Sequence, residues 1–262
     1  MYDTLSTDYD RFVNWHERLA FEMPFIEKCL AQVKQVGKPT RVLDAACGTG
    51  WHVLELMQRG YDAYGADISE RMIERAMTNA TSANVLSTIF KVAGFGGLAK
   101  AFLSQSMPHF DALLCLGNSL PHVSGLRELT NTLKDFSACL RPGGLLLIQN
   151  RNFDVVLEQR LRWMEPQSYQ QGNEEWLYLR FYDFEPDGAL GFNMLILHRD
   201  HQNHWQQMAE KTTLYPLRKI EIETALKKTG FEDAIFYGSM SGEPFDPLKS
   251  GNLVVLARLP QR

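Results

Sequence analysis

The chain has 262 residues, of which 45% are hydrophobic and 22% charged, with 27 basic against 31 acidic side chains. This length suits one large or two small domains, and the apolar fraction excludes a disordered protein. A net charge of −4 argues against a nucleic-acid partner, because such proteins usually carry a basic excess. Without a long apolar stretch or a signal peptide, we expect a soluble, cytoplasmic protein with no membrane partner.

From residue 41 onward, short apolar runs alternate with amphipathic stretches that carry helical spacing. The predicted strands cover residues 41–47, 61–67, 87–92, 110–118 and 145–150, and helices are expected between them. This alternation is typical of parallel βαβ units with helices on both faces of a sheet. The first 40 residues are expected to form a helical arm or lid.

Beyond residue 151 the pattern changes. Three extended stretches lie within 174–214, with hairpin spacing that predicts an antiparallel meander. A helix at 218–229 and strands near 231–237 and 252–258 follow. We therefore predict an α/β, doubly wound, Rossmann-like fold whose seven-stranded, mostly parallel sheet is formed by 41–160 and 215–262. An antiparallel β insertion at 161–214 is too short to be an independent core.

The turn after the first predicted strand, DAACGTG at 44–50, is the first candidate for a binding site. Open α/β sheets bind ligands beyond the carboxyl ends of their strands, and glycines let backbone N–H groups approach a ligand. Asp67 ends the second strand, where a carboxylate can accept hydrogen bonds from two ribose hydroxyls. The pattern predicts an adenosine-containing ligand. Val53 stands where a dinucleotide fingerprint has its third glycine, so a nicotinamide cofactor is disfavoured.

The motifs VLDAACGTG, YGADIS, FDALLCLGNSLPHV, LRPGGLLLIQN and ALKKTGF together resemble those of class I S-adenosylmethionine-dependent methyltransferases. The resemblance covers most of residues 40–258. Within that superfamily, CLGNSLPHV, RPGGLLLIQNRNFD and Tyr215-Pro216 are most similar to glycine N-methyltransferases and related glycine/sarcosine enzymes.

This resemblance implies S-adenosylmethionine as cofactor, with S-adenosylhomocysteine as product, and a small-molecule acceptor. The residues that it assigns to the cofactor are Trp15, Arg18, Asp44, Ala46, Gly48, Gly50, Asp67, Ile68, Gly94, Phe95 and Leu116. The residues that it assigns to a small amino-acid substrate are Asn118, Arg151 and Tyr215, and His122 would face the cofactor as the candidate catalytic base. Gly94 departs from the family pattern, because many of these enzymes have an acidic or amide side chain there.

Arg151 also has a rationale of its own. It directly follows a buried strand, and a guanidinium binds a carboxylate through two parallel hydrogen bonds. A surface salt bridge is the alternative for Arg151, and a structural role in the loop is the alternative for Asn118 and His122. We hypothesise methyl transfer to the amine of glycine or a similar carboxylate-bearing molecule. O-methylation of another metabolite and a cofactor-binding module without catalysis remain the alternatives, and a homo-oligomer is left open.

Two further patterns have simpler interpretations. His198, His201 and His204 lie in a predicted hairpin without accompanying carboxylates or cysteines, so we expect a solvated turn and no metal site. The four cysteines show no CxxC spacing, which argues against a disulfide scaffold or a zinc ribbon. The alternating aromatic residues Trp176, Tyr178, Tyr182 and Phe184 predict one face of a sheet, with an aromatic wall for a substrate or partner as the alternative.

Overall fold

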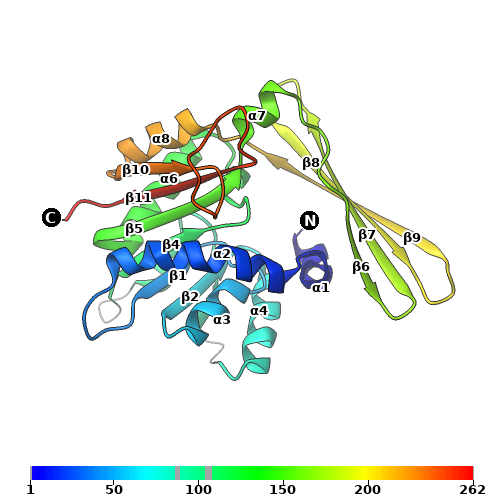
Figure 1. Ribbon diagram of the computed structural model, residues 1–262, viewed down its shortest axis with the longest axis horizontal. Coiled ribbons are helices and arrows are strands. Elements are labelled where there is room, and N and C mark those ends of the chain that lie inside the picture. Colours follow the sequence, from blue (N-terminus) through cyan, green and yellow to red (C-terminus); the bar gives the residue numbers. More distant parts are fainter. Residues whose placement is uncertain (1, 86–88, 104–107, 262) are drawn as a thin grey trace.

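The computed structural model describes residues 2–85, 89–103 and 108–261, with the side chains of residues 6 and 8 onward. A seven-stranded sheet with the order β10-β11-β5-β4-β1-β2-β3 forms its centre (Figure 1). The strands are β1 (Arg41–Asp44), β2 (Asp62–Asp67), β3 (Phe90–Val92), β4 (Phe110–Cys115), β5 (Leu140–Arg151), β10 (Glu232–Tyr237) and β11 (Asn252–Arg258). Only the pairings of β11 with β5 and β10 are antiparallel. The predicted fold class is confirmed; residues 87 and 88 of one predicted strand lie outside the described residues.

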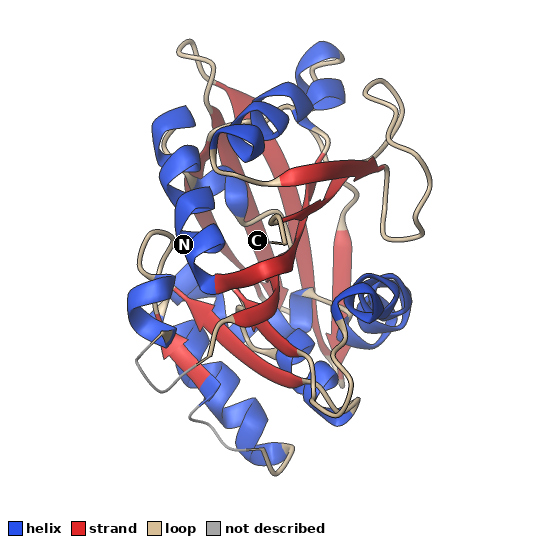
Figure 2. Cartoon of the chain, turned by 90° about the vertical axis from the view of Figure 1, so that its left-hand side faces the viewer, coloured by secondary structure: helices blue, strands red, loops and turns tan. Residues whose placement is uncertain are grey.

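Helices cover both faces of this sheet, as Figure 2 shows. Residues of α2 (Trp15–Leu30), α3 (Trp51–Gln58) and α4 (Glu70–Ser82) contribute to the hydrophobic cluster on one face. Residues of α5 (Leu98–Phe102), α6 (Leu126–Cys139) and α8 (Lys219–Lys228) contribute to the cluster on the other. Every residue of the central strand β4 is buried, which explains why its sequence is a continuous apolar run.

The segment between β5 and α8 begins with the short helix α7 (Phe153–Glu158) and forms a second, antiparallel sheet that projects from the body (Figure 1). Its four strands are β6 (Gln167–Gln171), β7 (Glu174–Phe184), β8 (Leu190–Arg199) and β9 (Trp205–Leu214). The three predicted stretches are confirmed as strands. Strand β6 was not predicted, because its sequence QSYQQ is polar and largely exposed.

The N-terminal helix α1 (Tyr2–Phe12) lies between the central body and the second sheet (Figure 1). The Phe12 ring packs edge-on against Tyr178 of β7, with 5.3 Å between ring centroids. Trp176, Tyr178 and Tyr182 are 6%, 1% and 1% exposed, so the predicted aromatic face of the sheet is confirmed. Helix α1 therefore packs against the buried aromatic face of the second sheet.

A buried carboxylate holds the amino-terminal edge of the sheet together. Asp111, at the start of β4, accepts hydrogen bonds from Gln35 Nε2 (2.9 Å), from the backbone N–H of Arg41 (2.8 Å) and from the Arg141 guanidinium. It is 5% exposed. This edge is opposite to the carboxyl ends of the strands, so its role is expected to be structural.

We expect Asp111→Ala to lower the free energy of unfolding by about 2–3 kcal/mol, because it removes charge-assisted hydrogen bonds and leaves their donors unpaired. Urea unfolding measures this loss. Asp62→Ala is the control, since its partly exposed pair with Arg41 (2.8 Å) should contribute less than about 1 kcal/mol. Equal losses in the two variants would contradict the assignment.

Candidate active site

A cavity of about 370 Å³ opens where the carboxyl ends of β1, β2 and β4 meet. This is the point at which the strand order reverses, between β1 and β4, and such points are the usual ligand sites of open α/β sheets. The sequence-predicted residues that line the cavity are Ala46, Gly48, Asp67, Ile68, Gly94, Phe95 and His122. Residues from four separate segments of the chain are thus brought together.

Backbone forms much of the cavity wall. Gly48 has φ +53°, and a Cβ built on it would lie 3.6 Å from the Tyr9 ring. A Cβ on Gly94 would lie 3.0 Å from Cδ1 of Ile68, so a side chain there could be accommodated only if Ile68 moved. Because these positions lack side chains, a ligand can approach the main chain closely.

The carboxylate of Asp67 ties two turns together at the cavity. Its Oδ2 accepts a hydrogen bond from the backbone N–H of Gly48 (2.9 Å), and its Oδ1 accepts one from Ser69 (2.9 Å). The first turn precedes α3, and the second precedes α4. A carboxylate offers about four acceptor positions, so Asp67 can accept further hydrogen bonds from a ligand while keeping both turns in place.

Three residues that were predicted to bind the cofactor lie behind the cavity wall. Asp44 is 2% exposed, and burial raises the pKa of its carboxyl to about 6, while its Oδ1 accepts from the Ala46 N–H (3.3 Å). Gly50 has φ +85°, and a Cβ there would lie 2.7 Å from the Phe90 ring. Leu116 is 3% exposed and packs in the core. Their position indicates that these three residues support the cavity wall from behind.

Trp15 and Arg18, in the predicted arm, also stand behind the wall. The Trp15 indole N–H donates to Asp10 (3.1 Å). The Nε of Arg18 donates to both carboxylate oxygens of Glu22 (3.1 and 3.2 Å), and its Nη2 lies 3.3 Å from where a Cβ on Gly117 would be. Gly117 itself lines the cavity, so Arg18 is one layer removed from it.

Tyr9 of α1, in the same predicted arm as Trp15 and Arg18, lines the cavity. Burial raises the pKa of its phenol, and the charge of Arg18 opposes that rise. Met72, Glu128 and Thr212 are further lining residues that were not predicted. They come from α4, α6 and β9, and no local motif links them to the glycine turn.

Asp10, the residue after Tyr9, holds α1 over the cavity. Its carboxylate accepts five hydrogen bonds, from the Thr49 hydroxyl (2.6 Å), the indole N–H groups of Trp51 (3.0 Å) and Trp15 (3.1 Å), the Arg75 guanidinium (2.9 Å) and the Asn79 amide (3.4 Å). These donors belong to α2, α3, α4 and the glycine turn itself. One carboxylate therefore connects the N-terminal helix to α2, α3, α4 and the glycine turn of the predicted cofactor site.

The predicted substrate residues Asn118, Arg151 and Tyr215 are not among the residues that line this cavity, and Asn118 and Arg151 meet at the end of β5. Asn118 has φ +64°, and its Oδ1 accepts from the backbone N–H of Arg151 (2.9 Å). Nε of Arg151 is buried and has no hydrogen-bond partner within the described residues. The Tyr215 side chain is directed toward α8 instead, because its hydroxyl donates to Glu221 (3.1 Å).

His122 lies in the 3₁₀ turn η3 (Leu120–His122) and lines the cavity. Burial lowers the pKa of its imidazole to about 4. The ring is therefore neutral near pH 7, and it is a weak base.

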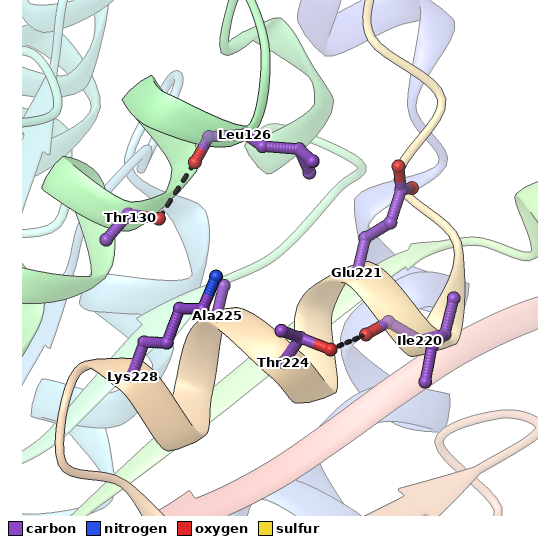
Figure 3. A pocket seen from close by; sticks show the side chains of 7 residues that line it. All are labelled: Leu126, Thr130, Ile220, Glu221, Thr224, Ala225 and Lys228. Carbon is purple, nitrogen blue, oxygen red and sulfur yellow. Dashed lines mark hydrogen bonds between the residues drawn. The ribbon is translucent and has the colours of Figure 1, made fainter.

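A second hollow, of about 150 Å³, lies between α6 and α8 on the outer surface (Figure 3). None of the predicted site residues lines it. The hydroxyls of Thr130 and Thr224 in this hollow donate to backbone carbonyls of their own helices (2.8 and 2.7 Å). It therefore presents no group that the cofactor site would need.

The histidines of the second sheet are near acidic residues without forming a metal site. His198 and His201 lie 3.8 and 3.9 Å from Glu174, and His204 lies 3.7 Å from Asp200. Over residues 2–85, 89–103 and 108–261, no group of three or more His, Cys, Asp or Glu residues could hold a metal ion. In the same part of the chain, no helix is both long and apolar enough to cross a membrane.

Comparisons with known proteins agree with this geometry. A family model described as a methyltransferase domain matches residues 42–144. A glycine/sarcosine N-methyltransferase of Aphanothece halophytica is 30% identical over 231 residues, which span 88% of this chain and 79% of that enzyme. A glycine/sarcosine/dimethylglycine N-methyltransferase of Actinopolyspora halophila is 29% identical over 231 residues, and this chain spans 37% of its length.

The solved structure of an S-adenosylmethionine-dependent methyltransferase of Clostridium acetobutylicum shares the fold, with a TM-score of 0.73, 19% identity and 99% of both chains covered. Fold and cavity thus define a nucleotide-binding α/β protein of the methyltransferase type. The chain belongs to the S-adenosylmethionine-dependent methyltransferases. It is an enzyme rather than a binding module without catalysis, and the backbone-lined cavity with Asp67 at a strand end fits its cofactor.

We expect Asp10→Ala to weaken S-adenosylmethionine binding about 10-fold, because α1 and its Tyr9 side chain would no longer be held over the cavity. Titration calorimetry measures the affinity, and amide hydrogen exchange over residues 2–12 should rise. Asp8→Ala is the matched control, because Asp8 pairs with Arg11 (2.6 Å) inside α1. Unchanged affinity and exchange in Asp10→Ala would overturn the lid assignment.

Proposed function

We propose that this methyltransferase acts on the amine of a small, carboxylate-bearing acceptor such as glycine or sarcosine. One observation carries the proposal. Arg151 is the last residue of β5 and lies beside Asn118, and its buried Nε lacks a partner within the described chain. A buried guanidinium is normally paired, and a carboxylate is its natural ligand. The two relatives compared above are named for methylation of glycine and sarcosine, which supports the same class of acceptor.

On the cofactor side, we assign the ribose hydroxyls to Asp67 and the methionine end to the turn at Ala46 and Gly48. Ile68 and Phe95 would flank the adenine, with the backbone of Gly94 in place of a side-chain contact. The Phe95 ring is itself held edge-on by Phe136, at 5.5 Å between centroids, so this wall is rigid. S-adenosylmethionine supplies the methyl group and, as a sulfonium, carries its own leaving group.

The protein's own contribution is orientation and exclusion of water. Arg151 would hold the acceptor's carboxylate so that its amine faces the cavity, and α1 with Tyr9 would cover the site. Holding two reactants in the right geometry contributes up to about 7–11 kcal/mol in favourable cases. No strong acid or base is required for this role.

We assign His122 to positioning rather than to proton transfer. An imidazole with a pKa near 4 is too weak a base to deprotonate an ammonium group, whose pKa is about 10. The acceptor would then react as the free amine, after losing its proton to solvent. The neutral ring remains able to hydrogen-bond beside the cavity.

Methyl-labelled S-adenosylmethionine offered with glycine, sarcosine, methylamine and glycolate tests the function. We expect label on the nitrogen of glycine or sarcosine and little on methylamine, which lacks the carboxylate. In Arg151→Ala, the KM for the acceptor should rise about 10- to 100-fold through the lost charged hydrogen bonds. The affinity for S-adenosylmethionine should stay within about twofold.

Label on glycolate oxygen would establish the O-methylation alternative instead. Absence of transfer to any acceptor, with cofactor binding intact, would overturn the proposal. Loss of cofactor affinity in Arg151→Ala would remove Arg151 from the acceptor side.

The pH profile distinguishes the two roles of His122. If the acceptor must deprotonate in solvent, log kcat/KM should rise with unit slope from about pH 6 toward the pKa of the amine. His122→Gln should keep this slope and lose less than about threefold in rate, because no proton transfer is removed. A loss of about 100-fold or more would show that His122 is a general base.

A further inference from the structure

Arg180 is a charged residue in the middle of a buried aromatic face. Alternate residues of a strand point to the same side of a sheet, so Arg180 shares its face with Trp176, Tyr178 and Tyr182. Its guanidinium lies over the Phe12 ring of α1, 4.8 Å from the centroid, and its Nη2 donates to the carbonyl of Glu165 (3.4 Å). Its Nε is buried and lacks a partner among the described residues.

Arg151, the last residue of β5, donates a hydrogen bond to the Tyr182 hydroxyl oxygen, and Tyr182 lies two residues from Arg180 on the same face of β7. Arg180 also lies over Phe12 of α1, the helix whose Tyr9 lines the cofactor cavity. Burial and, after it, the charge of Arg151 lower the pKa of Arg180. Two guanidiniums are thus held close together at the side of the cavity where the acceptor is proposed to bind.

Tyr182 adds a neutral donor to this pair. The side chain is 1% exposed; its hydroxyl oxygen accepts a hydrogen bond from the Arg151 guanidinium, while its own O–H has no acceptor in the described part of the chain. Burial raises the pKa of the phenol to about 12, against the opposing charges of Arg151 and Arg180, so it stays protonated at neutral pH. Buried polar groups are normally satisfied, and three unsatisfied donors in one place point to a ligand.

Other arginines of the second sheet are paired. Arg162 contacts Asp183 (3.0 Å), and Arg199 contacts Glu175 (2.9 Å). Within the described chain, no carboxylate forms such a pair with Arg151 or Arg180. Two unpaired, partly buried cations repel each other, and one carboxylate bound to Arg151 would neutralise only one of them.

We propose that Arg151 and Arg180 together bind an acceptor with two acidic groups, one on each guanidinium, with the Tyr182 hydroxyl donating between them. The acceptor class would be an amino acid whose side chain carries a second carboxylate. The identity of its amine as the methylated group rests on the proposed function, whereas the paired anion site does not. Arg180 is then a specificity-determining residue contributed by the inserted sheet.

Titration calorimetry with protein saturated with S-adenosylhomocysteine tests this site without requiring catalysis. The probes are aspartate against asparagine and glutamate against glutamine, which differ within each pair in charge and hardly in size. We expect at least one acid to bind 10-fold or more tightly than its amide. In Arg180→Gln the ratio should fall below about twofold, because the second cation is gone.

Arg162→Gln is the matched control and should keep the wild-type ratio, since that arginine is half exposed and paired with Asp183. Arg180→Lys keeps the positive charge but has a different donor geometry, so its ratio of acid to amide affinity should be intermediate. This second variant keeps the test valid if Arg180→Gln folds poorly. Arg180→Gln removes the contacts with Phe12 and Glu165 but breaks no ion pair within the described chain, so it should lower Tm by no more than about 2–4 °C.

Ratios near one in the wild type, or a ratio that survives Arg180→Gln, would overturn the two-acid site and leave a single carboxylate shared by both guanidiniums. Methylation of glycine with no preference for acids would overturn only this inference. Arg180-dependent binding of an acid without any methyl transfer would overturn only the proposed amine methylation.

Discussion

One carboxylate at the end of β2, one strand from the point where the strand order reverses, controls how the site is built. Asp67 accepts N–H groups from the turn before α3 and from the turn before α4, so both helices begin at a fixed distance from the same strand end. Parallel strands bring these turns to one edge, and glycine at position 48 lets the first turn adopt its left-handed conformation there. The cavity, the entry of α3 and the entry of α4 all follow from this arrangement.

The second group that determines how the site is built is Asp10 of α1, which is far from Asp67 in the sequence. Helix α1 is short and amphipathic, and by itself would be marginal in water. Its stability comes from Asp10 on one side and from the packing of Phe12 against β7 on the other. The same helix therefore contacts both the cofactor cavity and the inserted sheet.

Much of the fold could be predicted from the sequence because buried strands are continuous apolar runs and surface helices carry a 3.6-residue period. The glycine turn and Asp67 were also visible, since their spacing is local. Strand β6 was missed because it is polar on both faces, and Asp10 and Arg180 were missed for another reason. Their partners are contributed by distant segments, and a single charge inside an aromatic strand looks like any solvent-facing residue until the phase of the strand is considered.

The hairpin between β7 and β8 has a consequence for how such an enzyme could change its acceptor. Its turn is closed by the Gly188 N–H donating to the Glu185 carbonyl (3.1 Å), and the ladder above it pairs Arg180 with Met194. Side chains of a strand alternate between faces, so a slip of one residue would send Arg180 to solvent and bring Leu179 or Phe181 inward. Acceptor choice is in this sense a matter of strand register. A change in the length of one exposed turn could exchange an ionic pocket for an apolar one, while the glycine turn and Asp67 at the cofactor remain untouched.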